Sequence, residues 1–391
     1  MDTLLKFLVL VKMVYIVATF VQPGITAGVI ETSNNTTENR NEKVLSLFSV
    51  VNFPNLECNS LSSSFARGTC LASSECQSKG GTTSGTCAAG FGVCCLFTTS
   101  ACSSTVSNNV SYITNPGFPS TYNTAGTCTY TVNKISSDIC QLRLDFITLV
   151  QSVSTNPQGC CGAAPTCTIA SDSLTVLGKT GKNPPVICGT NTGEHMYVET
   201  GATDGDTVSL AFLVTGTSND QWNVKVSQIP CSASYRAPSN CVKYFTGSSG
   251  TVTSYGFPGD TQLTSQNYES CIRQEKGYCG IQWDESTLTA PKDAFDLTNA
   301  AVAGQANTGD TPAGCIASYI QIPNGVVAAT TGPRRFFCGE TLGVDTATTT
   351  SPVTTYTVPF SLTHFTSIAT QTATGPTVAN GFSLDYTQLP C

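Results

Sequence analysis

The chain carries an unusually high number of cysteines, 20 among 391 residues. Two pairs are adjacent: Cys94 with Cys95, at the end of the run GTCAAGFGVCC, and Cys160 with Cys161. An even count at this density is typical of a disulfide framework in an oxidising compartment. Zinc sites use C-x2-4-C or histidine pairs, but the chain has two histidines and no C-x-x-C. We therefore interpret the cysteines as disulfides rather than as metal ligands or reactive thiols.

The N-terminus predicts export. Lys6 and Lys12 precede an apolar run at residues 13–21, which is shorter than the ~20 residues that cross a bilayer. Residues 1–27 therefore fit a cleaved signal peptide, and an N-terminal anchor helix is the alternative. No later apolar run reaches ~18 residues. We expect a secreted, extracellular mature chain without a membrane span.

The amino-acid composition limits the classes of partner that this chain is expected to bind. Charged residues make up 11% of the chain and the formal net charge is -7, with no basic cluster. Nucleic acid and anionic membranes are not expected as partners, because both attract basic surfaces, and no cofactor is expected. Residues 31–43 are polar with no apolar residue and predict a disordered leader, which we assign to residues 28–52. The predicted N-glycosylation sites are Asn34, Asn35 and Asn109.

A small cysteine-dense module is predicted at residues 53–97. A segment this short cannot bury a large core and needs covalent staples. Adjacent side chains of an extended segment point to opposite faces, so Cys94 and Cys95 can each reach a different partner. The module holds Cys58, Cys70, Cys76, Cys87, Cys94 and Cys95.

The remainder is an internal repeat, at residues 101–231 and 239–391. NPGFP at Asn115 matches YGFPG at Tyr255, and VSQIPC matches YTQLPC at the two ends. Cys160 and Cys161 have no counterpart in the second copy. The first copy has Cys102, Cys128, Cys140, Cys167, Cys188 and Cys231, and the second has Cys241, Cys271, Cys279, Cys315, Cys338 and Cys391.

Both copies read as all-β. Segments such as QLRLDFITL, DTVSLAFLV and QWNVKVSQI alternate apolar with polar residues at period two, as half-buried strands do. Gly, Asn, Ser and Thr clusters separate them, and no long stretch has helical apolar spacing. Many short strands with turn signals predict one β-sandwich in each copy.

Residues 53–97 resemble a clip domain, the small module found ahead of arthropod serine proteases. That resemblance implies pairing of Cys58 with Cys94, Cys70 with Cys87, and Cys76 with Cys95. The two repeats resemble a pair of CUB domains, on the strength of NPGFPSTY at Asn115, Cys128-Thr-Tyr-Thr-Val, Leu142-Arg-Leu-Asp-Phe, the run from Cys167 through Asp172-Ser-Leu-Thr-Val, and Cys188-Gly189.

The resemblance implies two tandem CUB-type jelly-roll sandwiches, binding of proteins or glycans, and a cystine frame. Cys102 with Cys128, Cys241 with Cys271, Cys167 with Cys188, and Cys315 with Cys338 follow the CUB pattern. Symmetry between the copies then pairs Cys140 with Cys231 and Cys279 with Cys391. Cys160 and Cys161 remain for each other, unless one of them exchanges with Cys167.

Many CUB domains bind ligands through calcium held by three acidic residues. In the first copy these positions fall at Val150 or Gln151, at Asp172, and near Thr215, with Asp220 as a substitute. In the second copy they fall at Thr289, Ser318 or Tyr319, and Thr363, and none is acidic. Calcium takes six to eight oxygens, with carboxylates supplying charge. We therefore predict no metal site.

Catalysis is not expected. The sequence has no GDSGG, GxSxG or AHC-like motif, and a serine hydrolase needs a nucleophile, a base and an orienting acid. His195 and His364 are interpreted as exposed or hydrogen-bonded strand-edge residues rather than as catalytic ones. Acidic clusters at Asp204 and Asp284 read as solvated loops, with cation binding as the alternative.

The remaining candidates for a ligand surface are aromatic or basic. The adjacent pair Arg334 and Arg335 fits either a loop or a contact with an acidic partner. The aromatic candidates fit a sandwich core or, alternatively, a ligand surface. They are Trp222, Trp283, Tyr319, Phe336, Phe337, Tyr356, Phe360, Phe365 and Phe382.

The favoured function is a secreted, non-enzymatic protein- or glycan-binding protein. The alternatives are a non-catalytic regulator or decoy of clip or CUB serine proteases, and a venom component. Ligand identity is carried by loops and cannot be read from these patterns.

Overall fold

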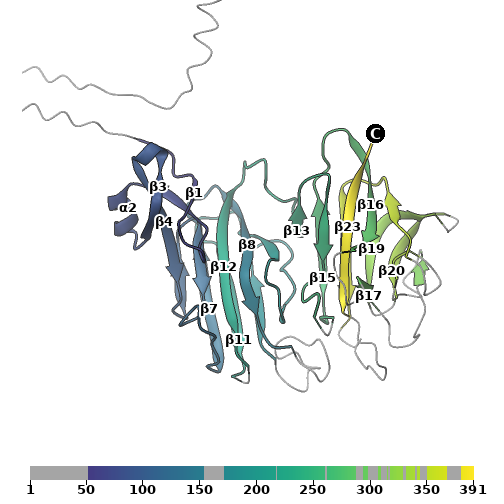
Figure 1. The fold of residues 1–391 in the computed structure, drawn as a ribbon, viewed down its shortest axis with the longest axis horizontal. Coiled ribbons are helices and arrows are strands. Elements are labelled where there is room, and N and C mark those ends of the chain that lie inside the picture. Colours follow the sequence, from purple (N-terminus) through teal and green to yellow (C-terminus); the bar gives the residue numbers. More distant parts are fainter. Residues whose placement is uncertain are drawn as a thin grey trace, which may run out of the picture. The chain divides into compact units, whose positions relative to one another are not determined.

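The structure is a computed structural model that describes residues 52–153, 171–216, 218–259, 262–287, 294–297, 307–309, 315, 318–328, 332–339, 341–343, 350–367 and 380–391. The chain divides into two compact units, of which the first ends at Cys95 and the second spans Leu96–Cys391. Within the described ranges, no helix has the length and apolar character needed to cross a bilayer. The fold is all-β, as predicted, with a small disulfide-rich module and two sandwiches (Figure 1).

The first unit is a short twisted sheet with one helix. Its strands lie in the order β1-β2-β4, and β3 also pairs with β4. The single turn-and-a-half helix presents Cys76 as its buried residue. The elements are β1 (Glu57–Asn59), β2 (Arg67–Leu71), α2 (Ser73–Ser78), β3 (Thr82–Cys87), the 3-10 turn η1 (Ala88–Gly90) and β4 (Gly92–Thr99).

Disulfides replace a hydrophobic core in this module. Adjacent Cys94 and Cys95 lie on β4 and bond to Cys58 and Cys76 respectively, so one strand is fastened to two different elements. The third bond joins Cys70 to Cys87. A side chain at Gly92 would approach both sulfurs of that bond to 2.9 Å. Glycine at this point of GTCAAGFGVCC therefore permits the strand to pass the cystine.

The first sandwich packs two four-stranded layers. One layer has the order β5-β7-β11-β9 and the other β6-β12-β8-β10, and β4 adds to the edge of β6 in parallel. The elements are β5 (Ser104–Val106), β6 (Ser111–Thr114), β7 (Gly126–Asn133), β8 (Ile139–Val150), β9 (Ser173–Leu177), β10 (His195–Glu199), β11 (Thr207–Val214) and β12 (Gln221–Pro230).

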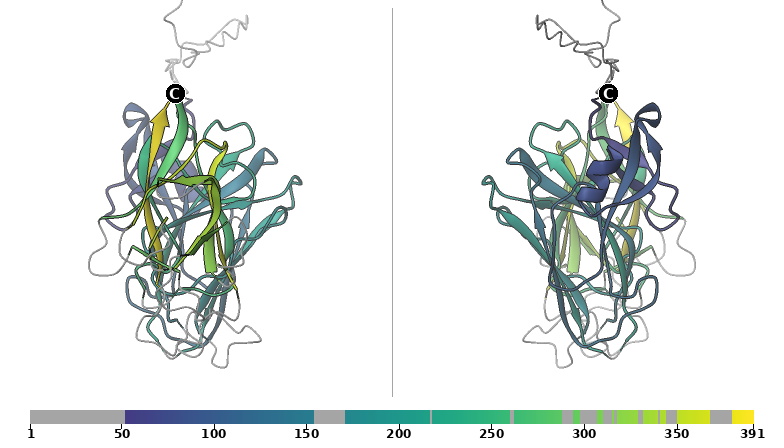
Figure 2. Two further views of the ribbon diagram at one scale, coloured as in Figure 1. Left: turned by 90° about the vertical axis from the view of Figure 1, so that its right-hand side faces the viewer. Right: turned by 90° about the vertical axis from the view of Figure 1, so that its left-hand side faces the viewer.

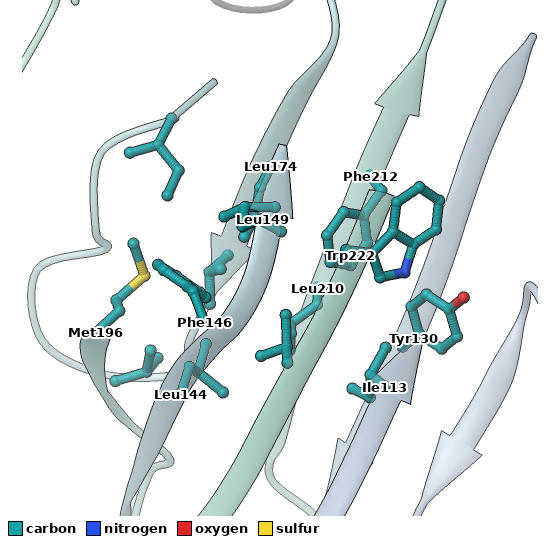
Figure 3. Close-up of a cluster of buried hydrophobic side chains, with 14 of the residues drawn as sticks. Ile113, Tyr130, Leu144, Phe146, Leu149, Leu174, Met196, Leu210, Phe212 and Trp222 are labelled. Atoms are coloured by element: carbon teal, nitrogen blue, oxygen red, sulfur yellow. The ribbon is translucent and has the colours of Figure 1, made fainter. Parts of the chain in front are cut away.

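The period-two pattern seen in the sequence fills the space between these layers. On β11, Val208, Leu210, Phe212 and Val214 are buried, while the residues between them are not. Trp222 of β12 is fully buried and stacks on Phe212 with ring centroids 4.4 Å apart (Figure 3). Trp222 is therefore a core residue rather than part of a ligand surface.

The second sandwich has more strands than the first, and β19 pairs with strands of both of its layers. The order is β13-β15-β22-β19-β21-β16-β23-β14, with β17 on β23 and with β20 between β18 and β19. The C-terminus follows β23 (Figure 2). The elements are β13 (Cys241–Phe245), β14 (Ser249–Thr253), β15 (Asn267–Ile272), β16 (Tyr278–Glu285), β17 (Phe295–Asp296), β18 (Asn307–Gly309), β19 (Ser318–Val327), β20 (Arg334–Cys338), β21 (Val353–Thr355), β22 (Phe360–Thr366) and β23 (Gly381–Pro390).

The internal repeat of the sequence is a repeat of topology. The order β5-β7-β11-β9 corresponds to β13-β15-β22-β19, and β6-β12-β8-β10 corresponds to β14-β23-β16-β21. In both copies the first pair is parallel, β5 with β7 and β13 with β15. The Phe118-Pro119 and Phe257-Pro258 peptides are both cis, so the matching glycine-proline turns share a backbone form.

The cystines of the second unit follow the same correspondence. Cys140 of β8 bonds to Cys231 after β12, and Cys279 of β16 bonds to Cys391 after β23. Cys188 is disulfide-bonded, while Cys160, Cys161 and Cys167 lie outside the described residues. The other bonds are Cys102–Cys128, Cys241–Cys271 and Cys315–Cys338.

Candidate functional site

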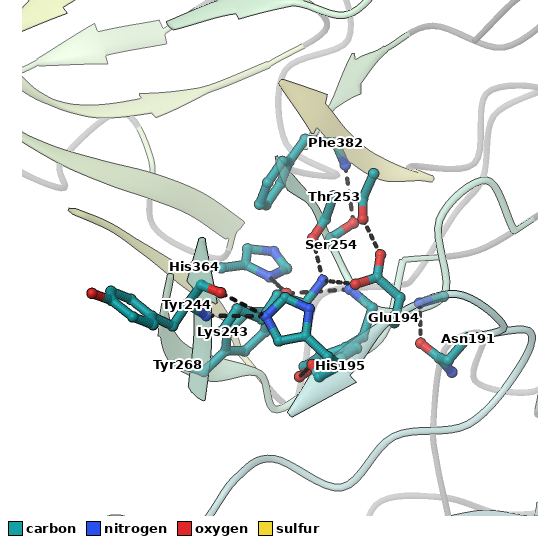
Figure 4. A network of polar contacts seen from close by, with 12 residues as sticks. Asn191, Glu194, His195, Lys243, Tyr244, Thr253, Ser254, Tyr268, His364 and Phe382 are labelled. Carbon is teal, nitrogen blue, oxygen red and sulfur yellow. Dashed lines mark hydrogen bonds and ion pairs between the residues drawn. The ribbon is translucent and has the colours of Figure 1, made fainter. Parts of the chain in front are cut away.

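Polar side chains converge where the two sandwiches meet, between β10 and β13 (Figure 4). Lys243 of β13 has no exposed side-chain surface. Its Nζ donates to Glu194 Oε2 at 2.6 Å and to the Thr253 carbonyl oxygen at 2.7 Å, and it lies 4.3 Å from the ring centroid of Tyr255. Glu194 belongs to the first sandwich, so one buried ion pair joins the two.

Neighbouring contacts extend this junction. The Gly256 N–H donates to Asn191 Oδ1 at 2.8 Å, and the Tyr255 hydroxyl donates to the His195 carbonyl oxygen at 2.8 Å. Tyr255 and Tyr268 also belong to the hydrophobic cluster of the first sandwich. The junction therefore combines apolar packing with an internal polar network.

Both histidines are buried structural residues. The backbone N–H of Tyr244 donates to His195 Nε2 at 3.1 Å, and His364 contacts Gln262 Nε2 and the Tyr268 hydroxyl. Burial, together with the charge of Lys243 and, for His195, that of Arg143, lowers the pKa of each histidine to about 3. The predicted strand-edge placement holds for His195 on β10, whereas His364 lies on the interior strand β22.

A second cluster lies at the loop end of the first sandwich, around Asp172. Its Oδ1 accepts hydrogen bonds from the Thr215 N–H at 2.6 Å and the Thr215 hydroxyl at 2.7 Å. Its Oδ2 accepts from the hydroxyls of Ser152, at 2.5 Å, and Ser218. Burial opposes ionisation, but these four hydrogen bonds together hold the pKa of Asp172 well below its usual value.

Asp220 completes this cluster as a second buried carboxyl. Ser218 Oγ lies 3.0 Å from Asp220 Oδ1, and Asp220 Oδ2 has no hydrogen-bond partner among the residues that the structure describes. Burial, together with a hydrogen bond to Asp172 and the charge on Asp172, raises the pKa of Asp220 to about 7. The Ser218 hydroxyl can donate its single proton to only one of the two carboxyl groups at a time. Below about pH 7 the Asp172–Asp220 pair therefore retains a proton, on Asp220.

A third candidate is the outer face of the β22–β19–β20 layer. Ile320 and Ile322 point into the core, so Tyr319 lies on the opposite, outer face. Tyr319 stacks on Phe365 at 4.9 Å and meets Phe336 edge-on at 5.0 Å. The Arg335 guanidinium lies 5.9 Å from the centroid of the Phe336 ring.

Arg335 is exposed on this face. Among the described residues it makes no ion pair, and its guanidinium contacts the side-chain oxygen of Gln321 at 3.1–3.2 Å. We name Tyr319, Gln321, Arg335, Phe336 and Phe365 the aromatic–arginine face. Sequence reasoning named its aromatic residues and Arg335 separately and had no signal that they share a face.

The other sequence candidates have different positions. Phe337, Phe360, Phe382 and Trp283 are core residues, and Tyr356 is 65% exposed. Asp284 accepts from Gln282 Nε2 at 3.2 Å. Asn109 Oδ1 accepts from the Gln228 N–H at 2.8 Å, while Asn34 and Asn35 lie outside the described residues.

Comparison with known proteins identifies the class of domain. Residues 238–389 match the family model described as the animal CUB domain, and the first sandwich has the same strand order. The chain therefore contains tandem CUB-type sandwiches. These comparisons identify no catalytic domain, and no curated protein sequence matches the chain.

Among solved structures, the chain is similar to the CUB1-EGF-CUB2 domains of rat MASP-1, with 15% identity, 74% of this chain and 99% of that chain covered, and a TM-score of 0.24. It is also similar to the MASP-1 CUB2 domain bound to Ca2+, with 14% identity, 32% and 99% coverage, and a TM-score of 0.23. The extracellular region of zebrafish Gpr126/Adgrg6 gives 12% identity, 73% and 36% coverage, and a TM-score of 0.26. Similarity at these values carries no functional argument.

The Asp172 cluster does not fit the calcium ion found in many CUB domains. Calcium takes six to eight oxygens, but the oxygens of Asp172 already accept four hydrogen bonds. Within the described ranges, no group of three or more His, Cys, Asp or Glu residues could hold a metal. In the second sandwich, the hydroxyl of Ser318 donates to Gln262 Oε1.

Substitution of the two carboxyl groups should have opposite effects. We expect D172N to lower the free energy of unfolding at pH 8 by about 1.5–3 kcal/mol, because hydrogen bonds to a charged acceptor are lost. D220N should raise the free energy of unfolding at pH 8 and should change it less at pH 5. The folded-state pKa of Asp220 is raised, so its ionisation destabilises the fold increasingly as pH rises from about 4 towards 7.

Denaturant unfolding at both pH values measures these effects. Calorimetric titration of the chelated protein should show no micromolar calcium site. A calcium site that D172N abolishes, or destabilisation by D220N at pH 8, would contradict this account of the cluster.

Proposed function

We propose that this protein is a secreted, non-enzymatic binding protein that captures an acidic extracellular protein through the aromatic–arginine face, without calcium. The observation that carries the proposal is Arg335, which is exposed beside the partly buried rings of Tyr319 and Phe365 and the buried ring of Phe336. Aromatic residues and arginine are the residue types that most often dominate binding energy at protein interfaces. The cystine-rich chain and its CUB-type sandwiches support an extracellular location.

The physical basis for an acidic partner is local charge. The chain as a whole is acidic, with a formal net charge of -7, and Arg335 places a positive charge beside aromatic rings on this face. Arginine presents a planar fork of donors that matches a carboxylate. The neighbouring rings supply apolar area around that contact, which excludes water and strengthens it.

Affinity capture tests the proposal. Immobilised full-length protein should retain acidic proteins from the extracellular fluid of its source in chelator as well as in calcium. R335E should reduce the affinity for a captured partner by at least about tenfold, the effect of losing more than 1.4 kcal/mol. The matched control is K276E, since Lys276 is an exposed cation elsewhere on the same sandwich.

The outcomes are distinct. Capture that requires calcium, or that R335E and K276E weaken equally, would contradict the proposal. Capture that is abolished by removing glycans from the partner would reassign the ligand to a glycan.

A second candidate is regulation of extracellular clip or CUB serine proteases by a chain with no catalytic role of its own. It is favoured by the three cystines of the first unit, Cys58–Cys94, Cys70–Cys87 and Cys76–Cys95, which match the pairing that the clip resemblance implies. Addition of the purified protein to a protease zymogen cascade, with zymogen cleavage as the readout, separates the two functions.

A further inference from the structure

His195 lies at the contact between the two sandwiches, where its ring is held by a backbone group of the other sandwich. It belongs to β10, and its Nε2 accepts the N–H of Tyr244 on β13 at 3.1 Å. An Nε2 that accepts a hydrogen bond carries no proton. The ring also meets Phe245 edge-on, with centroids 4.9 Å apart. A proton on Nε2 would remove the acceptor of the Tyr244 N–H.

The surroundings of the ring disfavour a positive charge. The residue is 8% exposed, and the cations Arg143 and Lys243 both act against its protonation. Nε2 also lies 3.1 Å from the Tyr244 carbonyl oxygen, which favours protonation but does not outweigh burial. The charged and titratable groups around it are Arg143 and Asp145 of β8, Glu194 before β10, Tyr197 of β10, and Lys243, Tyr244 and Tyr255 of the second sandwich.

We propose that the contact between β10 and β13 is a pH-sensitive joint, in which protonation of His195 releases the second sandwich from the first. Each sandwich has its own core and its own end-to-end cystine, Cys140–Cys231 or Cys279–Cys391. The joint can therefore open while both sandwiches stay folded. This regulatory step is independent of the ligand proposed above.

The direction of the pH dependence follows from linkage. The pKa of His195 is about 3 in the closed form and about 6.5 once the ring is exposed to water. The stability of the closed form is fully present above about pH 6.5 and is lost progressively as pH falls towards 3. Between pH 6.5 and 5 the ratio of open to closed molecules should rise roughly 16-fold, at up to tenfold per pH unit.

Hydrogen exchange can detect this opening even when the open form is a minor state. Val242, Tyr255, Leu263 and Tyr268 pack into the hydrophobic cluster of the first sandwich, so the closed form should predominate at neutral pH. Two backbone N–H groups report on the joint, since those of Tyr244 and Gly256 bond across it. The N–H groups of Phe212 on β11 and Leu384 on β23 report on the two sandwiches.

The experiment compares protection factors, corrected for intrinsic exchange rates, at pH 6.5 and 5 in the full-length protein. Protection at Tyr244 and Gly256 should fall roughly 16-fold and should stay below protection at Phe212 and Leu384 at both pH values. H195Q should remove the change at the joint, because the glutamine oxygen can accept the same N–H and does not titrate. H364Q is the matched control and should retain it, because His364 bonds only within the second sandwich.

Two results would overturn the proposal. One is joint protection in the unmodified protein that does not change between pH 6.5 and 5. The other is protection at the joint equal to that in both sandwich cores at each pH, which would indicate that the joint opens only by global unfolding. The first result needs no variant, so the proposal remains testable if H195Q does not fold.

Discussion

Replacing Lys243 by alanine is expected to lower the free energy of unfolding by about 3–5 kcal/mol, because removal of one partner leaves the other charge of a buried pair uncompensated. Lys243 is fully buried, and its ammonium bonds to Glu194 and to the Thr253 carbonyl oxygen. Glu194 is 17% exposed, so water solvates it only in part once the lysine is gone. The free space left by the lysine stem adds to the loss.

A double substitution separates charge from packing. K243M/E194Q keeps the side-chain volume while removing both charges, and it should recover most of the stability that K243A loses. The exposed lysine Lys276 provides the control, and K276A should change stability by no more than about 0.5 kcal/mol.

The measurement is denaturant unfolding followed by tryptophan fluorescence, since Trp222 and Trp283 lie fully buried in the first and second sandwich respectively. A K243A protein with unaltered stability would show that the ion pair does not stabilise the junction. Loss of the Trp222 signal together with the Trp283 signal would show that the two sandwiches unfold as one cooperative unit.

Removal of the long-range cystines should have a comparably large effect. A disulfide stabilises mainly by restricting the unfolded chain, and more so for longer loops. Cys279 and Cys391 are 112 residues apart, which corresponds to about 4.8 kcal/mol in the chain-entropy estimate. Both residues are exposed, so their replacement by serine leaves no cavity and isolates the loop effect.

The Cys102–Cys128 bond provides the comparison. It closes a loop of 26 residues, for which the same estimate is about 3.5 kcal/mol. The loss of stability from loop closure should therefore be larger in C279S/C391S than in C102S/C128S. Because Cys128 is buried, C102S/C128S also carries a packing cost that is separate from loop closure. Peptide mapping under non-reducing conditions tests the pairing, and a bond between the two repeats would contradict it.

Several features could be predicted from the sequence because they depend on local patterns. Period-two alternation in QLRLDFITL and DTVSLAFLV predicts half-buried strands, and these segments form β8 and β11. Repeated cysteine spacing and repeated glycine-proline turns predict two copies of one topology, which is the topology observed. The side-chain directions in an extended strand account for the adjacent Cys94 and Cys95 bonding to different partners.

The candidate site at Asp172 could be predicted only in part. The resemblance to CUB domains placed Gln151, Asp172, Thr215 and Asp220 at one end of the first sandwich, and the contacts of Asp172 with Thr215 and Ser218 are consistent with this. The hydroxyl donors Ser152 and Ser218 had no sequence signal. Serine is common in loops, and only the approach of three loops places those two hydroxyls against one carboxylate.

The sequence by itself determined the all-β class and the repeat, because alternation and spacing are properties of neighbouring residues. Tertiary structure alone decided the chemistry of the junction. In CVKYF, strand alternation places Lys243 opposite Val242 and Tyr244, on a face that is usually solvated. The first sandwich covers that face and supplies Glu194 and His195. A residue 49 positions away thus converts a surface lysine into a buried ion pair, since burial depends on which distant elements pack together.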